Sequence, residues 1–247
     1  MDLVSDSLDA TRAYYDEFSE RYDAERRPNR PCGYHALVDD LELELIARYG
    51  RGADVLECGA GTGLLLGRAA GFARSARGID LSSGMLAKAR ARGLDVCEAS
   101  VTDIPFDAGA FDVTYAFKVL PHVAAIRRAL AEMARVTRPG GVVLAEFYNP
   151  LSLRGLAKRV GPAGYVSDIT RESAVFTRFD PPWAIPRMLP PSLRLEGARG
   201  VRIVTPAAGF MRVPGLRRAL RAIERRLADT PAAFFAGFYI AVLRKQG

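Results

Sequence analysis

Three glycines at alternate positions follow an acidic side chain in the segment VLECGAGTG, residues 55–63. Because glycine lacks a Cβ atom, the spacing of Gly59, Gly61 and Gly63 lets the backbone turn sharply and lets a ligand approach it closely. A dinucleotide site of the G-x-G-x-x-G type needs a glycine or alanine at position 64, where this chain has Leu64. The carboxylate of Glu57 would also repel a pyrophosphate. The pattern therefore favours a nucleoside ligand that carries a cationic or amino group.

The glycine motif falls between a predicted strand and a predicted helix. Apolar runs predict strands at residues 53–59, 76–80, 95–100, 111–117, 141–147, 193–205 and 236–245. Helical spacing predicts helices at residues 11–22, 34–49, 63–73, 83–93, 124–136 and 213–228. Strands that alternate with helices indicate a doubly wound α/β fold, in which helices cover both faces of a parallel sheet.

Further motifs follow the glycine segment in a fixed order. They are GIDLSSGML, SVTDIPF, FDVTYAFKVLPHV and EMARVTRPGGVVLAEF, and the chain ends in AGFYIAVLRK. Together with VLECGAGTG they resemble the class I S-adenosylmethionine-dependent methyltransferases, ubiquinone/menaquinone-biosynthesis-like (methyltransferase type 11) branch, most clearly over residues 15–150. The resemblance implies a Rossmann-like seven-stranded sheet with an N-terminal helical lid and a variable insertion in the C-terminal part.

The domain organisation expected from this resemblance is a single methyltransferase domain over residues 1–247. Residues 1–50 would form the N-terminal helices and the lid, and residues 51–148 the cofactor-binding core. Residues 149–247 would supply a substrate-wall insertion and the final strands.

The resemblance also implies a set of cofactor contacts, with S-adenosyl-L-methionine as cofactor and S-adenosyl-L-homocysteine as product. Asp80 would accept hydrogen bonds from both ribose hydroxyls, Asp103 would accept one from the adenine amino group, and Ile104 would pack on the adenine face. A tyrosine of the leading helix, Tyr22 or Tyr15, would contact the methionine end. The remaining predicted contacts are Glu57, Gly59, Gly61, Gly63, Leu81, Met85 and Phe117.

Three side chains are candidates for a catalytic role. Glu146 and Tyr148 lie at the end of a predicted strand, and open α/β sheets bind ligands at the carboxyl ends of their strands. Many small-molecule members of the family carry two histidines where this chain has Pro121 and His122, and Pro121 cannot serve as the base. Packing roles are the alternative for Glu146, Tyr148 and His122. A base is needed for an amine or phenol acceptor but not for a carboxylate.

The predicted function is methyl transfer to a small, hydrophobic or aromatic organic acceptor, with the methylated atom (oxygen, nitrogen or carbon) left open. We expect the variable stretch 149–211 to line the acceptor pocket with apolar and aromatic side chains, among them Phe176, Phe179, Trp183 and Met188. One alternative is a non-catalytic nucleoside-binding regulatory module. Another is a methyltransferase that acts on a membrane lipid or a quinone precursor.

The net charge of +7 over 247 residues raises the question of an anionic partner. We do not expect nucleic-acid binding, because no aromatic side chains are interleaved with the arginines. The basic helix at 213–228 carries Leu216, Leu220, Ile223 and Leu227 on one side. We favour its packing on the sheet over peripheral membrane contact. The oligomeric state is left open.

The cysteine content and the first residues bear on the cellular location. Cys32, Cys58 and Cys97 are scattered and odd in number, which favours reduced thiols and offers neither a disulfide framework nor a metal site. The acidic start MDLVSDSLDA lacks the regions of a signal peptide, and no apolar run approaches the roughly 20 residues of a membrane span. We therefore expect a cytoplasmic protein.

Overall fold

A seven-stranded sheet forms the centre of the molecule, in the order β3-β2-β1-β4-β5-β7-β6. The computed structural model describes the chain except for residues 1–2, 27–32, 153–175 and 206–207. The strands are β1 (Asp54–Cys58), β2 (Ser75–Asp80), β3 (Asp95–Glu98), β4 (Phe111–Ala116), β5 (Thr137–Tyr148), β6 (Leu193–Val201) and β7 (Phe238–Lys245). All seven predicted strands are confirmed.

The strands β3, β2, β1, β4 and β5 are parallel, whereas β7 runs antiparallel to both of its neighbours. The parallel arrangement inferred from the alternation of strands and helices therefore holds for these five strands and is interrupted at β7. The connection from β6 to β7 begins and ends at the same end of the strands, so β7 runs in the opposite direction to β6 and no crossover is needed. The sheet is therefore mixed, which is common among large α/β sheets.

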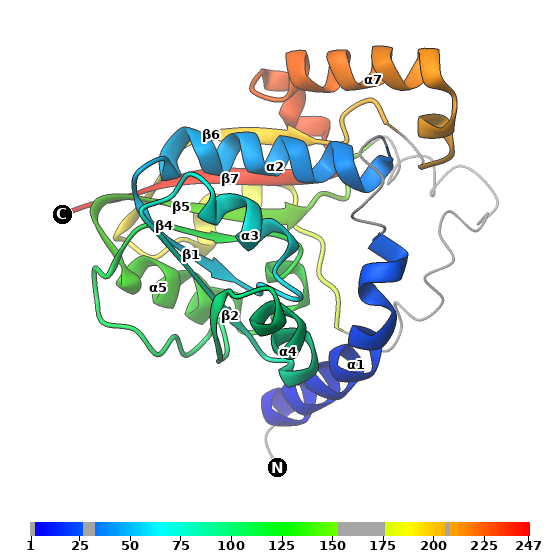
Figure 1. Cartoon of the computed structure of the whole chain (residues 1–247). Coiled ribbons are helices and arrows are strands. Elements are labelled where there is room, and N and C mark those ends of the chain that lie inside the picture. Colours follow the sequence, from blue (N-terminus) through cyan, green and yellow to red (C-terminus); the bar gives the residue numbers. More distant parts are fainter. Residues whose placement is uncertain (1–2, 27–32, 153–175, 206–207) are drawn as a thin grey trace.

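The helices are α1 (Leu3–Arg26), α2 (Tyr34–Gly50), α3 (Leu64–Ala70), α4 (Ser83–Ala91), α5 (Ile126–Val136) and α7 (Pro214–Leu227). Short 3-10 turns are η1 (Leu120–His122), η3 (Pro182–Met188), η4 (Ala208–Arg212) and η5 (Pro231–Phe235). The leading helix is longer than the predicted 11–22. In Figure 1, α2 and α5 flank the sheet, α1 lies beside α4, and α7 is the outermost helix, beyond α2.

Two apolar layers hold these helices on the sheet. On one face, Leu41 and Leu45 of α2 pack with Val55, Tyr115 and other strand side chains. On the opposite face, α5 and η3 pack against alternate residues of the same strands, including Leu56, Phe147, Leu130, Met133 and Ile185. The two faces use alternate residues because successive side chains of a strand point to opposite sides. This double cover is what the alternation of strands and helices predicts.

Two further expectations concern the cysteines and membrane-spanning helices. Cys58 and Cys97 are free thiols, and Cys32 lies outside the described residues. Within the described part of the chain, no helix combines the length and the apolar character that a membrane crossing requires.

Candidate functional site

The strand order reverses between β1 and β4, and the glycine loop follows β1 at this point. From β1 the chain builds outward through β2 and β3, and it then returns to the other side of β1 with β4 and β5. Open α/β sheets bind ligands in the crevice that such a reversal leaves at the carboxyl ends of the strands. The topology therefore puts residues 59–63 where a ligand is expected.

The three glycines of the loop all adopt the left-handed backbone, with φ of 80°, 53° and 79° at Gly59, Gly61 and Gly63. Their surroundings differ. A Cβ atom on Gly59 would lie 2.1 Å from Val119 Cγ2, and one on Gly63 would lie 2.2 Å from Leu94 Cδ1, so a side chain at either position would force these neighbours to move. A Cβ on Gly61 would meet nothing within 4 Å. The backbone of Gly61 thus faces open space, where a ligand can approach it.

Asp80, the last residue of β2, binds the glycine loop directly. Its Oδ2 accepts a hydrogen bond from the Gly61 amide at 2.8 Å, and its Oδ1 accepts one from the Ser82 amide at 2.9 Å. Each carboxylate oxygen has two lone pairs, so both can still accept from a ligand hydroxyl. Burial raises the pKa of Asp80 above its usual value, although these backbone donors oppose the shift.

Helix α1 is fastened across the glycine loop and the start of α4. Asp16 accepts hydrogen bonds from Ser82 Oγ at 2.6 Å and from the Gly84 amide at 3.0 Å. Asp23 accepts one from Thr62 Oγ1 at 2.7 Å. These bonds tie the leading helix to the two segments that carry Gly61 and Asp80, which is the position expected of a lid.

Two tyrosines of α1 face this region. Burial raises the pKa of Tyr15, and the charge of Asp80 contributes to the shift. Burial also raises the pKa of Tyr22, which lies within the electrostatic reach of Glu57 and Lys118. The Tyr22 ring makes an edge contact with Phe18 at 5.6 Å. Both predicted lid tyrosines are thus shielded from solvent and lie within the electrostatic reach of carboxyl groups at the ends of β1 and β2.

The residues predicted for the adenine side lie after β2 and β3. Asp103 is exposed, whereas Ile104 is buried in the core on the α5 face and its amide donates to Glu132 Oε2 at 3.0 Å. Leu81 is half-buried, and Met85 is buried in the first turn of α4. Asp103 is thus the predicted polar contact that is most accessible to a ligand.

A group of buried charges lies between α2 and the ends of β1, β4 and β5. Lys118 Nζ lies 2.6 and 2.7 Å from the two carboxylate oxygens of Glu42, and the Lys118 amide donates to Glu146 Oε1 at 3.0 Å. Glu146 Oε2 accepts no hydrogen bond from a described donor. Glu57, also buried, accepts a hydrogen bond from Tyr115 Oη at 3.4 Å. Several carboxylates thus share few cations.

The pKa values of this group reflect its burial. Burial and the neighbouring carboxyl of Glu42 raise the pKa of Glu146 to about 8, although Lys118 opposes the shift. Burial raises the pKa of Glu57 well above its usual value. Burial alone would lower the pKa of Lys118, but Glu42, Glu146 and Asp39 outweigh it and hold the ammonium charged. The group favours an additional cation or a retained proton.

Lys118 also has an unusual backbone, with φ of 61°. A left-handed conformation costs a residue with a side chain about 1 to 2 kcal/mol, and such strain concentrates at functional sites. The contacts of its amide with Glu146 and of its ammonium with Glu42 hold Lys118 in this conformation. Phe117, beside it, is buried and packs on Tyr115 at 5.5 Å between ring centres.

His122 of η1 and Tyr148 at the end of β5 belong to a group of aromatic side chains that contact one another. His122 Nδ1 lies 3.1 Å from the Phe176 carbonyl and 3.2 Å from Thr177 Oγ1, and its ring meets Tyr148 edge-on at 5.7 Å. The Tyr148 ring also packs on Phe238 at 5.3 Å. These contacts join His122 of η1 to the described segment that begins at residue 176.

The aromatic residues predicted for the acceptor pocket divide into exposed and buried members. Phe176, Phe179 and Trp183 are 46%, 57% and 53% exposed. Trp183 stacks on Phe234 of η5 at 5.8 Å. Met188 is instead buried in the core beside α5, where it packs with Ile185, so it differs in its surroundings from the three exposed aromatic residues. The rest of the predicted wall, residues 153–175, lies outside the described residues.

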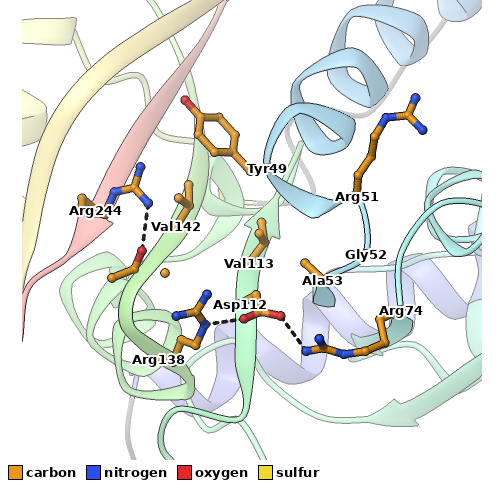
Figure 2. A pocket seen from close by; sticks show the side chains of 12 residues that line it. Tyr49, Arg51, Gly52, Ala53, Arg74, Asp112, Val113, Arg138, Val142 and Arg244 are labelled. Atoms are coloured by element: carbon orange, nitrogen blue, oxygen red, sulfur yellow. Dashed lines mark hydrogen bonds and ion pairs between the residues drawn. The ribbon is translucent and has the colours of Figure 1, made fainter.

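A cavity of about 320 Å³ lies at the other end of the parallel strands, near their amino ends. It is lined by residues that precede β1 and β2, by residues near the start of β4 and β5, and by Arg244 near the end of β7. Figure 2 shows Asp112 between Arg74 and Arg138, with which it forms ion pairs. Because ligands of α/β sheets bind at the carboxyl ends and this cavity lies at the amino ends, it does not belong to the candidate site.

Sequence reasoning missed Glu42 and Lys118. Glu42 follows Leu41 on the predicted helix 34–49, and a charge next to the apolar stripe of a helix could have marked it. Lys118 ends the apolar run FDVTYAFK and could have been recognised as a charge at the end of a buried strand. Their pairing could not be predicted, because 76 positions separate them in the chain.

The comparisons with known proteins point in one direction. Residues 56–145 match the model of a methyltransferase domain family. The demethylmenaquinone methyltransferase of Clavibacter sepedonicus is 31% identical over 198 residues, which cover 74% of this chain and 79% of that protein. The demethylmenaquinone methyltransferase of Paenarthrobacter aurescens (strain TC1) is 38% identical over 118 residues, but the match spans only 47% of this chain and 44% of that relative.

A solved structure resembles the whole fold. It is a SAM-dependent methyltransferase from Thermotoga maritima, which superposes with a TM-score of 0.68 over 95% of this chain and 99% of its own. The sequence identity is 16%, so the likeness is one of fold.

Proposed function

Because the chain belongs to the class I S-adenosylmethionine-dependent methyltransferases, of the menaquinone-biosynthesis-like kind, we propose that it transfers a methyl group to a small, hydrophobic or aromatic organic acceptor. The observation that carries the proposal is the open space over Gly61, whose amide is held by Asp80 at the end of the neighbouring strand. A nucleoside fits this arrangement, because the backbone is bare and a carboxylate with spare lone pairs stands beside it.

The charges of the site support the same cofactor. S-adenosylmethionine supplies, when bound, a methyl group already activated on a sulfonium, and it also carries an ammonium group. Three buried carboxyl groups, those of Glu57, Glu42 and Glu146, lie near the single ammonium of Lys118. A cationic ligand would therefore reduce the repulsion among the carboxylates. In this proposal Asp80 holds the ribose, Asp103 and Ile104 meet the adenine, and Glu57 with Tyr22 faces the methionine end.

Alignment of the acceptor with the methyl group is the main catalytic task of the protein. Holding two reactants in line supplies several kcal/mol of the barrier reduction, and exclusion of water protects the reaction. Helix α1, fastened by Asp16 and Asp23, would close the site over the cofactor. Exposed Phe176, Phe179 and Trp183 offer apolar surface to an aromatic acceptor near the ends of β5 and β7.

Glu146 is the proposed proton acceptor. A general base works best when its pKa lies near the operating pH, and the pKa of Glu146 is raised to about 8. Its Oε2 accepts no hydrogen bond from the described residues, so that oxygen can take a proton. A phenol or hydroquinone acceptor would lose its hydroxyl proton to Glu146. The resulting phenolate oxygen, or a ring carbon that the phenolate activates, would then attack the methyl group. His122 and Tyr148 would border the acceptor.

The relatives named demethylmenaquinone methyltransferase suggest where to look for the acceptor. A short-chain demethylmenaquinol and a simple phenol are the first compounds for a methyl-transfer assay. We expect Glu146→Gln to lower kcat for either compound by roughly 100-fold, within the usual range for loss of a general base, and to weaken binding of S-adenosylhomocysteine much less. An unchanged kcat would remove Glu146 from the mechanism.

Cofactor binding is tested by calorimetric titration with S-adenosylhomocysteine, with NADH as the comparison ligand. Asp103→Asn should weaken binding because it removes the carboxylate proposed to meet the adenine. It should leave the fold intact, because this exposed carboxylate forms no hydrogen bond with the described residues. Asp107→Asn is the matched control, an exposed aspartate four positions away. Tight binding of NADH alone would refute the proposal, and binding of S-adenosylhomocysteine without transfer to any acceptor would favour a regulatory module.

A further inference from the structure

Glu146 is held through one of its two carboxylate oxygens. Its Oε1 accepts a hydrogen bond from the Lys118 amide at 3.0 Å, whereas its Oε2 accepts none from the described residues. Glu146 is fully buried near the end of β5, and Lys118 follows the end of β4 by two residues. Because β4 and β5 are parallel neighbours, the amide and the carboxylate meet at the carboxyl ends of the strands. The Lys118 amide therefore occupies one oxygen of Glu146 and leaves the other to an acceptor.

The direction of this amide depends on the left-handed backbone of Lys118. With Arg202, Lys118 is one of two described residues other than glycine with a positive φ, here 61°. The angle φ is the rotation about the bond between N and Cα. With the side chain held in place, an ordinary φ would turn the amide by roughly 120°. The N–H group would then no longer point at Glu146.

The side chain of Lys118 is held in place by α2. Its Nζ lies 2.6 and 2.7 Å from the two carboxylate oxygens of Glu42, which is fully buried. Hydrogen bonds between two charged groups are short and strong, and the contact with both oxygens restricts the position of the ammonium. The ion pair with Glu42 thus stabilises the strained backbone that directs the amide toward Glu146.

The charged groups around Glu146 come from several elements. Among them Glu42 has the largest effect on the pKa of Glu146, which it raises, and Lys118 lowers that pKa. On β7, the residue opposite Glu146 is the apolar Ile240. The other titratable groups within electrostatic reach of Lys118, Glu42 or Glu57 are Tyr22 and Arg26 of α1, His35 and Asp39 of α2, Asp80 of β2 and Tyr115 of β4.

We propose that Lys118 and Glu42 are positioning residues for Glu146 in methyl transfer. The Lys118 amide binds Oε1 and so presents Oε2 to the acceptor hydroxyl, while the ion pair with Glu42 keeps Lys118 in the backbone conformation that directs the amide. Neither side chain takes the proton of the acceptor. This inference rests on the proposed role of Glu146 as proton acceptor, and it adds the two residues that orient that group.

Two substitutions at position 118 separate the backbone from the ammonium. Lys118→Gly and Lys118→Ala both remove the ammonium, but only glycine adopts a positive φ without strain. Lys118→Gly should therefore keep the amide on Glu146 Oε1 and retain a kcat roughly tenfold above that of Lys118→Ala. The kcat is taken at the plateau of each pH profile, per site counted by titration with S-adenosylhomocysteine. Equal kcat values in the two variants would overturn the inference.

Glu42→Gln tests the ion pair without a change at position 118. Because a base must be deprotonated to act, kcat of the parent should rise with pH as Glu146 loses its proton. Loss of the Glu42 carboxylate lowers the pKa of Glu146, so this rise should move to lower pH by about one unit or more. Lys118→Gly should move it to higher pH, because the ammonium is lost. A purely structural role would change stability and leave both profiles in place.

The matched control is Asp40→Asn on the same helix, which breaks the ion pairs with Arg68 and Arg221. Its pH profile should coincide with that of the parent. Unshifted profiles in both test variants, or an equal shift in the control, would overturn this inference while a reduced kcat in Glu146→Gln still supports the proposed function. No methyl transfer by the parent, or an unchanged kcat in Glu146→Gln, would refute the proposed function and this inference with it.

Discussion

The ammonium of Lys118 lies between the two carboxylate oxygens of Glu42, at 2.6 and 2.7 Å. This pair joins the end of β4 to α2, and the amide of the same lysine holds Glu146 at 3.0 Å. One residue with a left-handed backbone therefore links the helix, the strand end and the proposed base. Since removal of Lys118 would leave the fully buried carboxylate of Glu42 without its ion pair, the pair is a sensitive point for both stability and function.

Removal of the lysine should destabilise the fold strongly. Lys118→Met leaves Glu42 and Glu146 buried without their cation, and breaking such a pair typically costs about 3 to 5 kcal/mol. Urea unfolding at neutral pH measures the effect. The double variant Lys118→Met/Glu42→Met should recover much of the loss, because it also removes Glu42, the carboxylate that forms the ion pair with Lys118. A double variant as unstable as Lys118→Met would show that packing, and not charge, explains the effect.

The pH dependence of stability should change in Glu146→Gln. The pKa of Glu146 is raised in the folded state to about 8, from 4.5, so the protonated form is favoured by folding. This contribution to stability is complete below pH 4.5 and is lost as the pH rises toward 8. Glutamine does not titrate, so the variant should gain on the parent by on the order of 3 kcal/mol between pH 5 and 8.

Chemical denaturation across this pH range tests that difference. Glu132→Gln serves as the control, because hydrogen bonds from Arg135 lower the pKa of Glu132 and its titration ends below this window. Parallel stability curves for the parent and Glu146→Gln would contradict the assignment.

Alanine at each glycine of the loop should separate packing from ligand contact. Gly63→Ala should destabilise the protein, because the new Cβ meets Leu94 at 2.2 Å. Gly61→Ala adds about 1 to 2 kcal/mol of backbone strain without a clash, yet it should abolish binding of S-adenosylhomocysteine. Gly93→Ala has the same positive φ and open surroundings away from the site, so it reproduces the strain and should bind normally.

Thermal unfolding and calorimetry on the three glycine variants give both readouts. Normal binding by Gly61→Ala would mean that the open space over Gly61 is not occupied by the ligand.

The anchoring of α7 by the buried Glu224 should be measurable. Glu224→Ala leaves the amides of residues 203–205 without an acceptor and should cost about 3 kcal/mol in urea unfolding. Glu196→Ala removes an exposed carboxylate paired with Arg244 and should cost less than about 1 kcal/mol. If both changes cost the same, Glu224 does not anchor the helix.

The local pattern of the sequence determined the strands, most helices and the glycine loop. These features depend on residues that are near one another in the chain: the period of apolar side chains, the glycines after a strand, and the acidic residues at the ends of β2 and after β3. The left-handed backbone at Gly59, Gly61 and Gly63 also follows from residue type, because glycine alone adopts it without strain.

The tertiary structure decided which distant side chains meet. Lys118 pairs with Glu42 because α2 packs across the end of β4. β7 is antiparallel because α7 and η5 return the chain to the end of the strands at which β6 stops. Leu216 and Ile223 are exposed, whereas Glu224 on the same helix is buried and accepts hydrogen bonds from three backbone amides. Each outcome is a competition between groups far apart in the chain, and a pattern of near neighbours carries no information about it.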